Sequence, residues 1–161
     1  MAFDIFIKID GIKGESSDAQ HRDEIEAVSF SWGAQQATTS TGGGAGAGKV
    51  SFQDLHVLMP VSQASPQLFL ACAQGRHLKT TVLACRKAGG RDQQDFLKVT
   101  LSDVIVASYQ TNGQAEEGVP VDEVSFAYAQ IEVEYRPQKA DGSMEDSVMA
   151  GWNLKTNEPL D

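Results

Sequence analysis

Apolar and polar residues alternate along much of this chain, with the period of two that is typical of β-strands. The alternation is regular in residues 3–9, 24–32, 49–57, 78–87, 96–109 and 121–135. Polar or glycine-containing segments separate these stretches, as expected of the turns between strands. The pattern therefore predicts an all-β fold.

In several of these stretches the apolar residues change from one face of the strand to the other. The changes lie between Phe52 and Leu55, between Leu101 and Val104, and between Tyr128 and Ile131. One extra residue moves every later side chain to the opposite face, so each change indicates a bulge or a bend. Strands that bend midway while keeping their apolar side inward coil antiparallel sheets into sandwiches and barrels. We expect a closed or nearly closed β-barrel of two antiparallel sheets.

The strand predicted over residues 24–32 has one large apolar face and one small polar face. Val28, Phe30 and Trp32 share the apolar face, and we assign them to the core. Ser29 and Ser31 lie on the opposite face, so their hydroxyl groups should point away from the core.

One segment carries the start and stop signals of a short α-helix, over about residues 65–74. Ser65 is a good N-cap, Pro66 suits the first helical position, and Gly75 suits a left-handed stop. The apolar residues that share one face of this helix are Leu68, Ala71 and Cys72. We expect this face to plug an end of the barrel or to pack on its side.

A polar, glycine-rich segment follows the strand that ends near Trp32. Its residues are Thr38, Thr39, Ser40, Thr41, Gly42, Gly43, Gly44, Ala45, Gly46, Ala47 and Gly48. With nothing apolar enough to bury, it should project into solvent or onto another molecule. Residues 43–49 have the spacing of a phosphate-binding loop, but Val50 replaces the hydroxyl residue that holds magnesium and a strand follows in place of a helix. No nucleotide cofactor is expected.

Charge and length limit the possible partners. The 161 residues include 22 acidic and 13 basic side chains, a formal net charge of −9, which disfavours nucleic acid and anionic membranes as partners. We find neither an apolar run long enough to span a membrane nor a basic region at the start typical of a secretory signal, so we expect a cytoplasmic protein without membrane insertion. The composition fits one domain over residues 1–161, with a polar tail from about residue 138.

The chain has no recognisable catalytic or metal-binding pattern. Cys72 and Cys85 are predicted to be reduced thiols packed as small apolar groups. His21, His56 and His77 lack metal-ligand spacing and are read as surface or turn residues. With no nucleophile motif either, we predict that the protein is not an enzyme and has no catalytic residue, bound metal or cofactor.

Several short blocks together resemble the Hcp family, the haemolysin-coregulated proteins of bacterial type VI secretion systems. The blocks are residues 6–9, 11–16, 24–25, 31–33, 48–50, 53–55, 86–90 and 151–153, in family order. The resemblance implies a two-sheet β-barrel with one helix, assembled as a hexameric ring with a wide channel. Rings of this family stack into the inner tube, which a contractile sheath propels outward behind a spike, and small effector proteins ride in the channel. Such proteins leave the cytoplasm through the machine they build.

The resemblance also implies roles for two regions of the chain. Ser29 and Ser31 are expected to face the channel and its effectors, and residues 38–48 are expected to reach the next ring. The alternative reading is a monomeric barrel that binds a small apolar ligand inside, which calls for small inward residues and a cavity. A hydrolase would need a catalytic constellation that we do not find.

Overall fold

The computed structural model of the chain describes residues 2–37, 48–87 and 93–161. These residues form one α-helix, α1 (Ala64–Gln74), and strands on either side of it. The strands are β1 (Phe3–Ile9), β2 (Ile25–Ala27), β3 (Ser29–Ser31), β4 (Ala34–Gln36), β5 (Val50–Phe52), β6 (Leu55–Pro60), β7 (His77–Lys87), β8 (Asp95–Asn112), β9 (Val121–Tyr135), β10 (Val148–Asn153) and β11 (Glu158–Pro159). The predicted all-β class with one short helix is confirmed.

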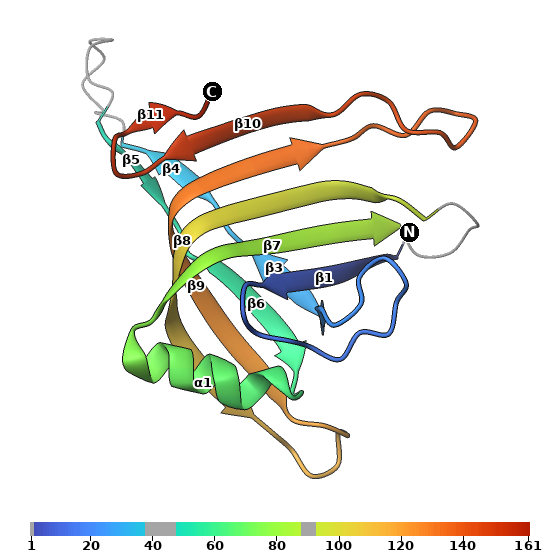
Figure 1. Cartoon of the computed structure of the whole chain (residues 1–161), viewed down its shortest axis with the longest axis vertical. Coiled ribbons are helices and arrows are strands. Elements are labelled where there is room, and N and C mark those ends of the chain that lie inside the picture. Colours follow the sequence, from blue (N-terminus) through green and yellow to red (C-terminus); the bar gives the residue numbers. More distant parts are fainter. Residues whose placement is uncertain (1, 38–47, 88–92) are drawn as a thin grey trace.

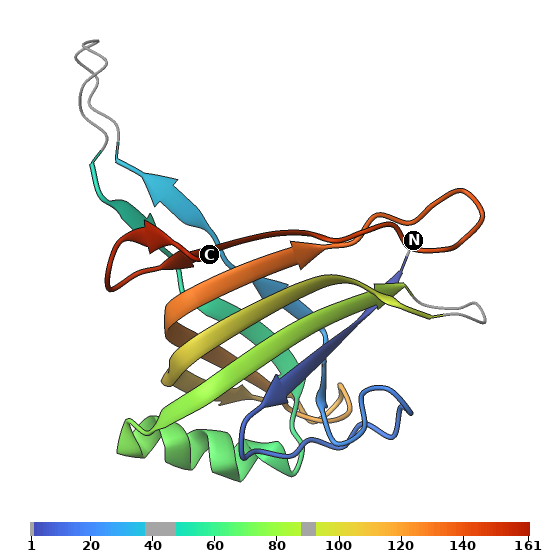
Figure 2. The ribbon, with the colours of Figure 1, turned by 45° about the horizontal axis from the view of Figure 1, so that its top comes forward.

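Most strands belong to one antiparallel sheet that folds over into two layers (Figure 1). The first layer has the order β11-β10-β9-β8-β7-β1-β2. The second layer consists of β3, β6 and the other halves of β9 and β8. The long strands β8 and β9 pair along almost their whole length and therefore belong to both layers. A separate two-stranded sheet, β4–β5, extends away from this body (Figure 2).

The bends in β8 and β9 lie near the predicted changes of face. In β8, Leu101 and Val104 are both fully buried. They are three positions apart, and a regular strand would place them on opposite faces. Between them Asp103 has a positive φ of 53°, and the β8–β9 register shifts between Val106 and Ser108. The predicted change between Phe52 and Leu55 coincides with the break between β5 and β6. The bends let one face of each strand remain inward as the sheet turns over.

Of the two predicted forms, a closed or a nearly closed barrel, the closed form is not found, because the sheet does not close in the described residues. The path of hydrogen-bonded strands ends at β11 on one side and at β2 on the other. The chain runs directly from β2 to β3, but β2 pairs with β1 in one layer while β3 pairs with β6 in the other. The two layers are thus connected by the chain at this point without a continuous ladder.

The assignment of Val28 to the core is also wrong. Val28 is 59% exposed, whereas Phe30 and Trp32 are half-buried and pack against the core. Val28 lies between β2 and β3, where the strand changes partner, and the change of face occurs at this residue. Ile25 and Ala27 point inward before it and Phe30 after it, so an unbroken alternation through residue 28 gives the wrong side.

Helix α1 covers one end of the space between the layers (Figure 1), and its buried residues Leu68 and Ala71 join the core. Gly75 ends it in the left-handed conformation, as predicted. The predicted N-cap is wrong: the helix begins one residue earlier, and Ser65 is buried in its first turn. There the Ser65 hydroxyl donates a hydrogen bond to Asp122 of β9 instead of capping the helix.

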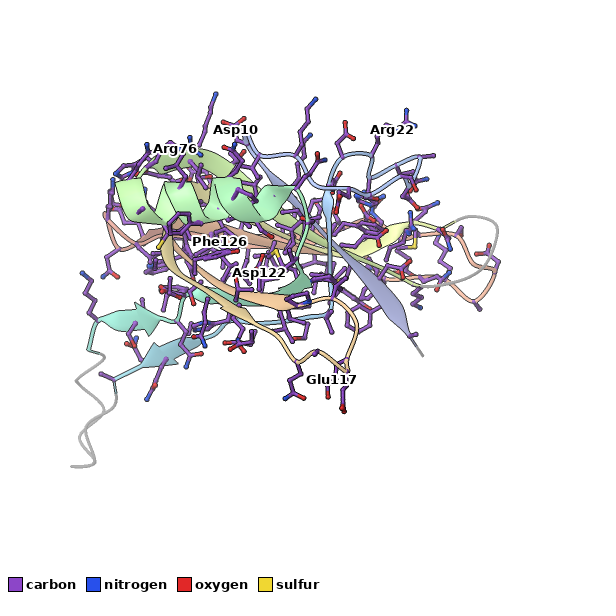
Figure 3. The ribbon with its side chains drawn as sticks, turned by 90° about the horizontal axis from the view of Figure 1, so that it is seen from below. Asp10, Arg22, Arg76, Glu117, Asp122 and Phe126 are labelled. Carbon is purple, nitrogen blue, oxygen red and sulfur yellow. The ribbon has the colours of Figure 1, made fainter. Side chains whose placement is uncertain are left out.

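Large apolar side chains fill the space between the layers. The largest fully buried ones are Phe126, Ile7, Leu55, Met59, Leu68, Leu83 and Leu101. Figure 3 shows Phe126 and Asp122 beneath α1, inside the fold. The segment expected to be a polar tail contributes two strands, since β10 pairs with β9 and β11 pairs with β10.

Candidate functional site

The candidate site is the outward face of the second layer, formed by β3, β6, β9 and β8. Because side chains alternate along a strand, the residues that face away from the core stand in rows across these strands. One row consists of Ser31, His56, Ser125 and Ser108. The next row consists of Ser29, Leu58, Glu123 and Gln110.

These two rows line a groove of about 570 Å³. Most of the row residues carry a hydroxyl or an amide, and Glu123 carries the negative charge of the lining. The Ser125 Oγ and His56 Nδ1 atoms lie 2.7 Å apart, which fixes the orientation of the imidazole ring. The face can therefore offer many neutral hydrogen bonds and little fixed charge.

The Ser125–His56 pair does not amount to a catalytic triad. In such a triad the other imidazole nitrogen is held by a carboxylate that orients the ring. Among residues 2–37, 48–87 and 93–161, no carboxylate is hydrogen-bonded to His56. The pair can bind a polar group but lacks the third member needed to activate the serine.

Both serines predicted to point away from the core are exposed and lie on this face. The expected ring-stacking residues 38–47 lie outside the described residues. Gly48, the last residue of that prediction, is described, and its N–H donates a hydrogen bond to the Ala37 carbonyl oxygen over 3.2 Å. Together with the β4–β5 pairing, this bond places both ends of the segment side by side at the tip of the hairpin.

Sequence reasoning did not identify the rest of the face. His56, Ser108 and Ser125 are isolated polar residues in three different strands, and their sequence spacing gives no sign that they meet. The one feature of the sequence that could have indicated them is that each lies at a polar position of the alternating pattern of its own strand. The cross-strand register that assembles them depends on the bends and is not a local property of the sequence.

The chemistry of metals, thiols and membranes gives no further site. In the described part of the chain, no three His, Cys, Asp or Glu side chains come together as metal ligands. Both cysteines are free, and burial, with a smaller contribution from Asp95, raises the pKa of the Cys85 thiol to about 11, so it stays protonated. Within residues 2–37, 48–87 and 93–161, the helix is too short to cross a membrane.

Comparison with known proteins gives a consistent picture. The family model described as "Type VI secretion system effector, Hcp" matches residues 6–135. Protein hcp1 of Pseudomonas aeruginosa is 43% identical over 159 residues, which covers 98% of each chain.

Solved structures agree in fold over almost the whole chain. A structure described as a type six secretion system protein has a TM-score of 0.93 and 34% identity, and the match covers 99% of this chain and 100% of the other. Hcp1 from Salmonella typhimurium has a TM-score of 0.82 and 35% identity over the same shares of the two chains.

Proposed function

The chain belongs to the Hcp family of type VI secretion system proteins, and from this premise we propose that six copies of it close into a ring around a channel. Members of the family are structural components of the secretion tube, so this protein is a tube component that assembles with itself. The proposal adds the number of subunits, the face that lines the channel and the segment that joins successive rings.

One observation carries the assignment of the channel face. The outward face of the second layer holds Ser29 and Ser31 in a groove lined mainly by uncharged polar groups, although the chain has a formal net charge of −9. A channel that carries different effector proteins must bind each of them weakly. Neutral hydroxyl and amide groups do this, because they form hydrogen bonds directly or through water without attracting or repelling a cargo by charge.

The free edges of the sheet support closure into a ring. Strands β2 and β11 end the path of pairing, and exposed edges with unpaired backbone groups favour pairing with another chain. A contact between two different surfaces of identical subunits generates a ring when the rotation closes. The edge of one subunit is proposed to contact a different surface of its neighbour.

The remaining assignments follow from the same premise. The whole chain acts as one domain, and residues 38–48 join one ring to the next from the tip of the β4–β5 hairpin. The spike and the contractile sheath are the proposed partners of the tube, and small effectors are its cargo. The protein is made in the cytoplasm, leaves through the type VI apparatus, needs no cofactor and is not an enzyme.

The alternative of a monomeric barrel with an internal ligand lacks support. The groove lies on an outward face, whereas the inner side of the same strands is packed with large side chains such as Phe126 and Leu55. Light scattering of the purified protein tests the proposal directly, with six subunits as the expected mass. A single species of monomer mass at concentrations used for assembly would contradict it.

The channel face is tested by Ser31→Asp, with Ser102→Asp as the matched control on the outward face of the other layer. Six added charges around the channel should reduce co-purification of small effectors from the native host. Neither serine lies in the core, so each variant should keep its free energy of unfolding within about 0.5 kcal/mol of the wild type and should form rings. Equal effector yields in the two variants would show that Ser31 does not face the cargo.

A further inference from the structure

A buried histidine lies in the loop of residues 10–24 between β1 and β2, on the outer side of the first layer. His21 lies in a turn, one of the two predicted settings, but it is only 6% exposed and is therefore not a surface residue. Its ring stacks on the Phe6 ring, with 4.2 Å between the ring centroids and 5° between the ring planes. The loop therefore covers a small aromatic contact that is separate from the core between the layers.

Both nitrogens of the His21 ring face carboxylates. The Nδ1 atom lies 2.9 Å from Glu24 Oε1, and the Nε2 atom lies 2.9 Å from Asp95 Oδ1 at the start of β8. A neutral imidazole has a single N–H group and can donate to only one of these oxygens, whereas an imidazolium donates to both. Two short contacts, one at each ring nitrogen, therefore fit a protonated His21 ring.

The surrounding charges favour the protonated ring. Burial acts to lower the pKa of His21, but the hydrogen bonds and charges of Asp95 and Glu24 raise it, and the net effect is a pKa above the ordinary value. From β7, Arg86 lies over the Phe6 ring, with its Cζ atom 4.9 Å from the centroid. Two carboxylates accept hydrogen bonds from Arg86 and offset its charge: Asp18 of the loop and Asp4 of β1.

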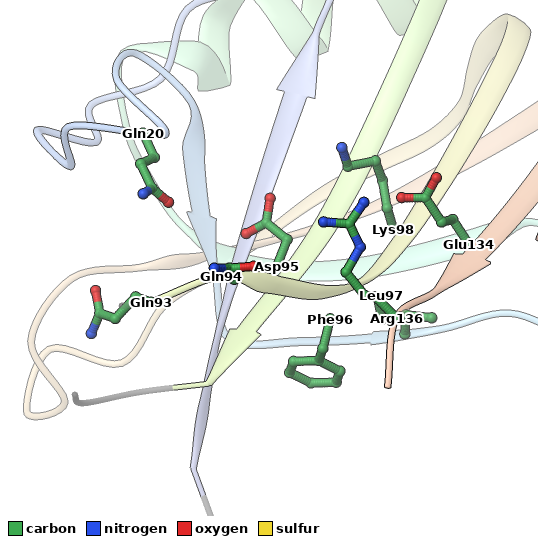
Figure 4. A pocket seen from close by; sticks show the side chains of 9 residues that line it. All are labelled: Gln20, Gln93, Gln94, Asp95, Phe96, Leu97, Lys98, Glu134 and Arg136. Carbon is green, nitrogen blue, oxygen red and sulfur yellow. The ribbon is translucent and has the colours of Figure 1, made fainter. Parts of the chain in front are cut away.

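The contact with Asp95 joins parts of the chain that are far apart in sequence. It links the loop to β8 across 74 residues, whereas the contact with Glu24 stays within the loop. Figure 4 shows Gln20, the neighbour of His21, and Asp95 lining one pocket, which has a volume of about 210 Å³. Release of Asp95 would remove this link between the loop and β8, while the hydrogen bonds from Arg86 to Asp18 would still join the loop to β7.

We propose that His21 is a pH-sensitive clamp, which fastens the β1–β2 loop to the start of β8 when it is protonated and releases it when it is neutral. The clamp lies at the end of the subunit away from the β4–β5 hairpin (Figures 1 and 2). The inference stands on the geometry of one subunit and does not depend on the proposed ring.

The direction of the pH effect follows from the raised pKa. The clamp contributes its full stability below the ordinary pKa of 6.5, and the contribution is lost as the pH rises through the higher pKa of the closed loop. Between these two pKa values the equilibrium constant for loop opening should rise about tenfold per pH unit. Outside this window it should be constant.

Nuclear magnetic resonance measures both parts of the inference on the intact protein. The ring nitrogens of His21 should titrate above pH 6.5 and show both N–H groups below that transition. The backbone N–H groups of Gly14, Ser16 and Asp23 form hydrogen bonds within the loop, so their hydrogen-exchange protection factors should fall in the same pH window as the loop opens. The amides of β8 and β9 should keep theirs.

Two variants make the test specific. In Asp95→Asn, the side-chain amide can hydrogen-bond a neutral ring, so the loop should stay closed and the pH dependence should become much smaller, with Glu24 left as the one carboxylate beside the ring. His77→Gln is the control, because His77 is exposed and faces one carboxylate, that of Asp103. A His21 that titrates at or below pH 6.5, or loop amides with constant protection, would overturn the clamp.

Discussion

The two layers present very different outward faces, although both contain β8 and β9. In the first layer the outward positions of these strands hold Lys98 opposite Glu134 and Thr100 opposite Glu132. Beyond the bend, the outward positions of the second layer hold Ser108 opposite Ser125 and carry the groove. One pair of strands therefore carries more charge on its outward side in the first layer than in the second, where Glu123 is the charged residue of the groove.

This difference shows that the bends do more than enclose a core. They separate the surface into a charged side, which water solvates strongly, and a side with little charge, which can approach other proteins at a low desolvation cost. A flat pair of strands would present both kinds of residue on the same face.

The largest effect is expected from Phe126→Ala, which removes the largest fully buried side chain at the junction of the layers. Emptying such a site should lower the free energy of unfolding by about 3–5 kcal/mol, since contacts in both layers are lost. The midpoint of urea denaturation measures the effect. Val28→Ala is the control, because Val28 is 59% exposed and its truncation should cost no more than about 0.5 kcal/mol. A larger decrease in the free energy of unfolding of Val28→Ala would show that Val28 belongs to the core.

An intermediate effect is expected from Asp122→Ala, which acts beneath the groove. The buried Asp122 carboxylate accepts hydrogen bonds from the hydroxyl groups of Ser65, Tyr109 and Thr111. Its removal leaves these donors without their partner and detaches the first turn of α1 from β9, which should cost about 2–3 kcal/mol. Chemical denaturation measures the loss.

The adjacent Glu123 supplies the control for that experiment. Glu123 is exposed in the groove, and its substitution by Ala should change the free energy of unfolding by less than about 0.5 kcal/mol. Similar losses in the two variants would mean that the Asp122 network does not hold the helix.

The smallest effect is expected in acid and should be confined to the loop on the first layer. The hydrogen bonds from Arg86 hold the pKa of Asp18 well below its ordinary value of 3.8. This pairing therefore stabilises the loop above pH 3.8 and is lost as the pH falls below it. Hydrogen exchange of the loop amides should accelerate in that range, relative to the intrinsic rate, while amides of the second layer stay protected. Simultaneous loss of protection in the loop and in the second layer would contradict the expectation that the acid effect is confined to the loop.

Local signals in the sequence predicted a large part of the fold. Strand β1 has the predicted bounds, Phe3–Ile9, because its alternation is uninterrupted. The left-handed stop at Gly75 and the break between Phe52 and Leu55 were also predicted, since each depends on residue types that are adjacent in the chain. The outward position of Ser29 and Ser31 followed from the same alternation.

The features that the sequence did not reveal depend on distant partners. Val28 is exposed because the strand changes its pairing partner there, and Ser65 is buried because Asp122 lies opposite it. The burial of His21, read as a surface or turn residue, could not be predicted because its partner Asp95 lies 74 residues away. The groove likewise requires the register of several strands, which no single stretch contains.

The passage of β8 and β9 through both layers also has a mechanical consequence. Hydrogen bonds in an antiparallel ladder run perpendicular to the strands, so a force along the strands loads many of them in shear at once. The eighteen residues of β8 and the fifteen of β9 should therefore resist a force along the strands as one unit. A force applied to one layer is transmitted to the other through the covalent backbone of β8 and β9. Separation of the layers would therefore require these two strands to unfold.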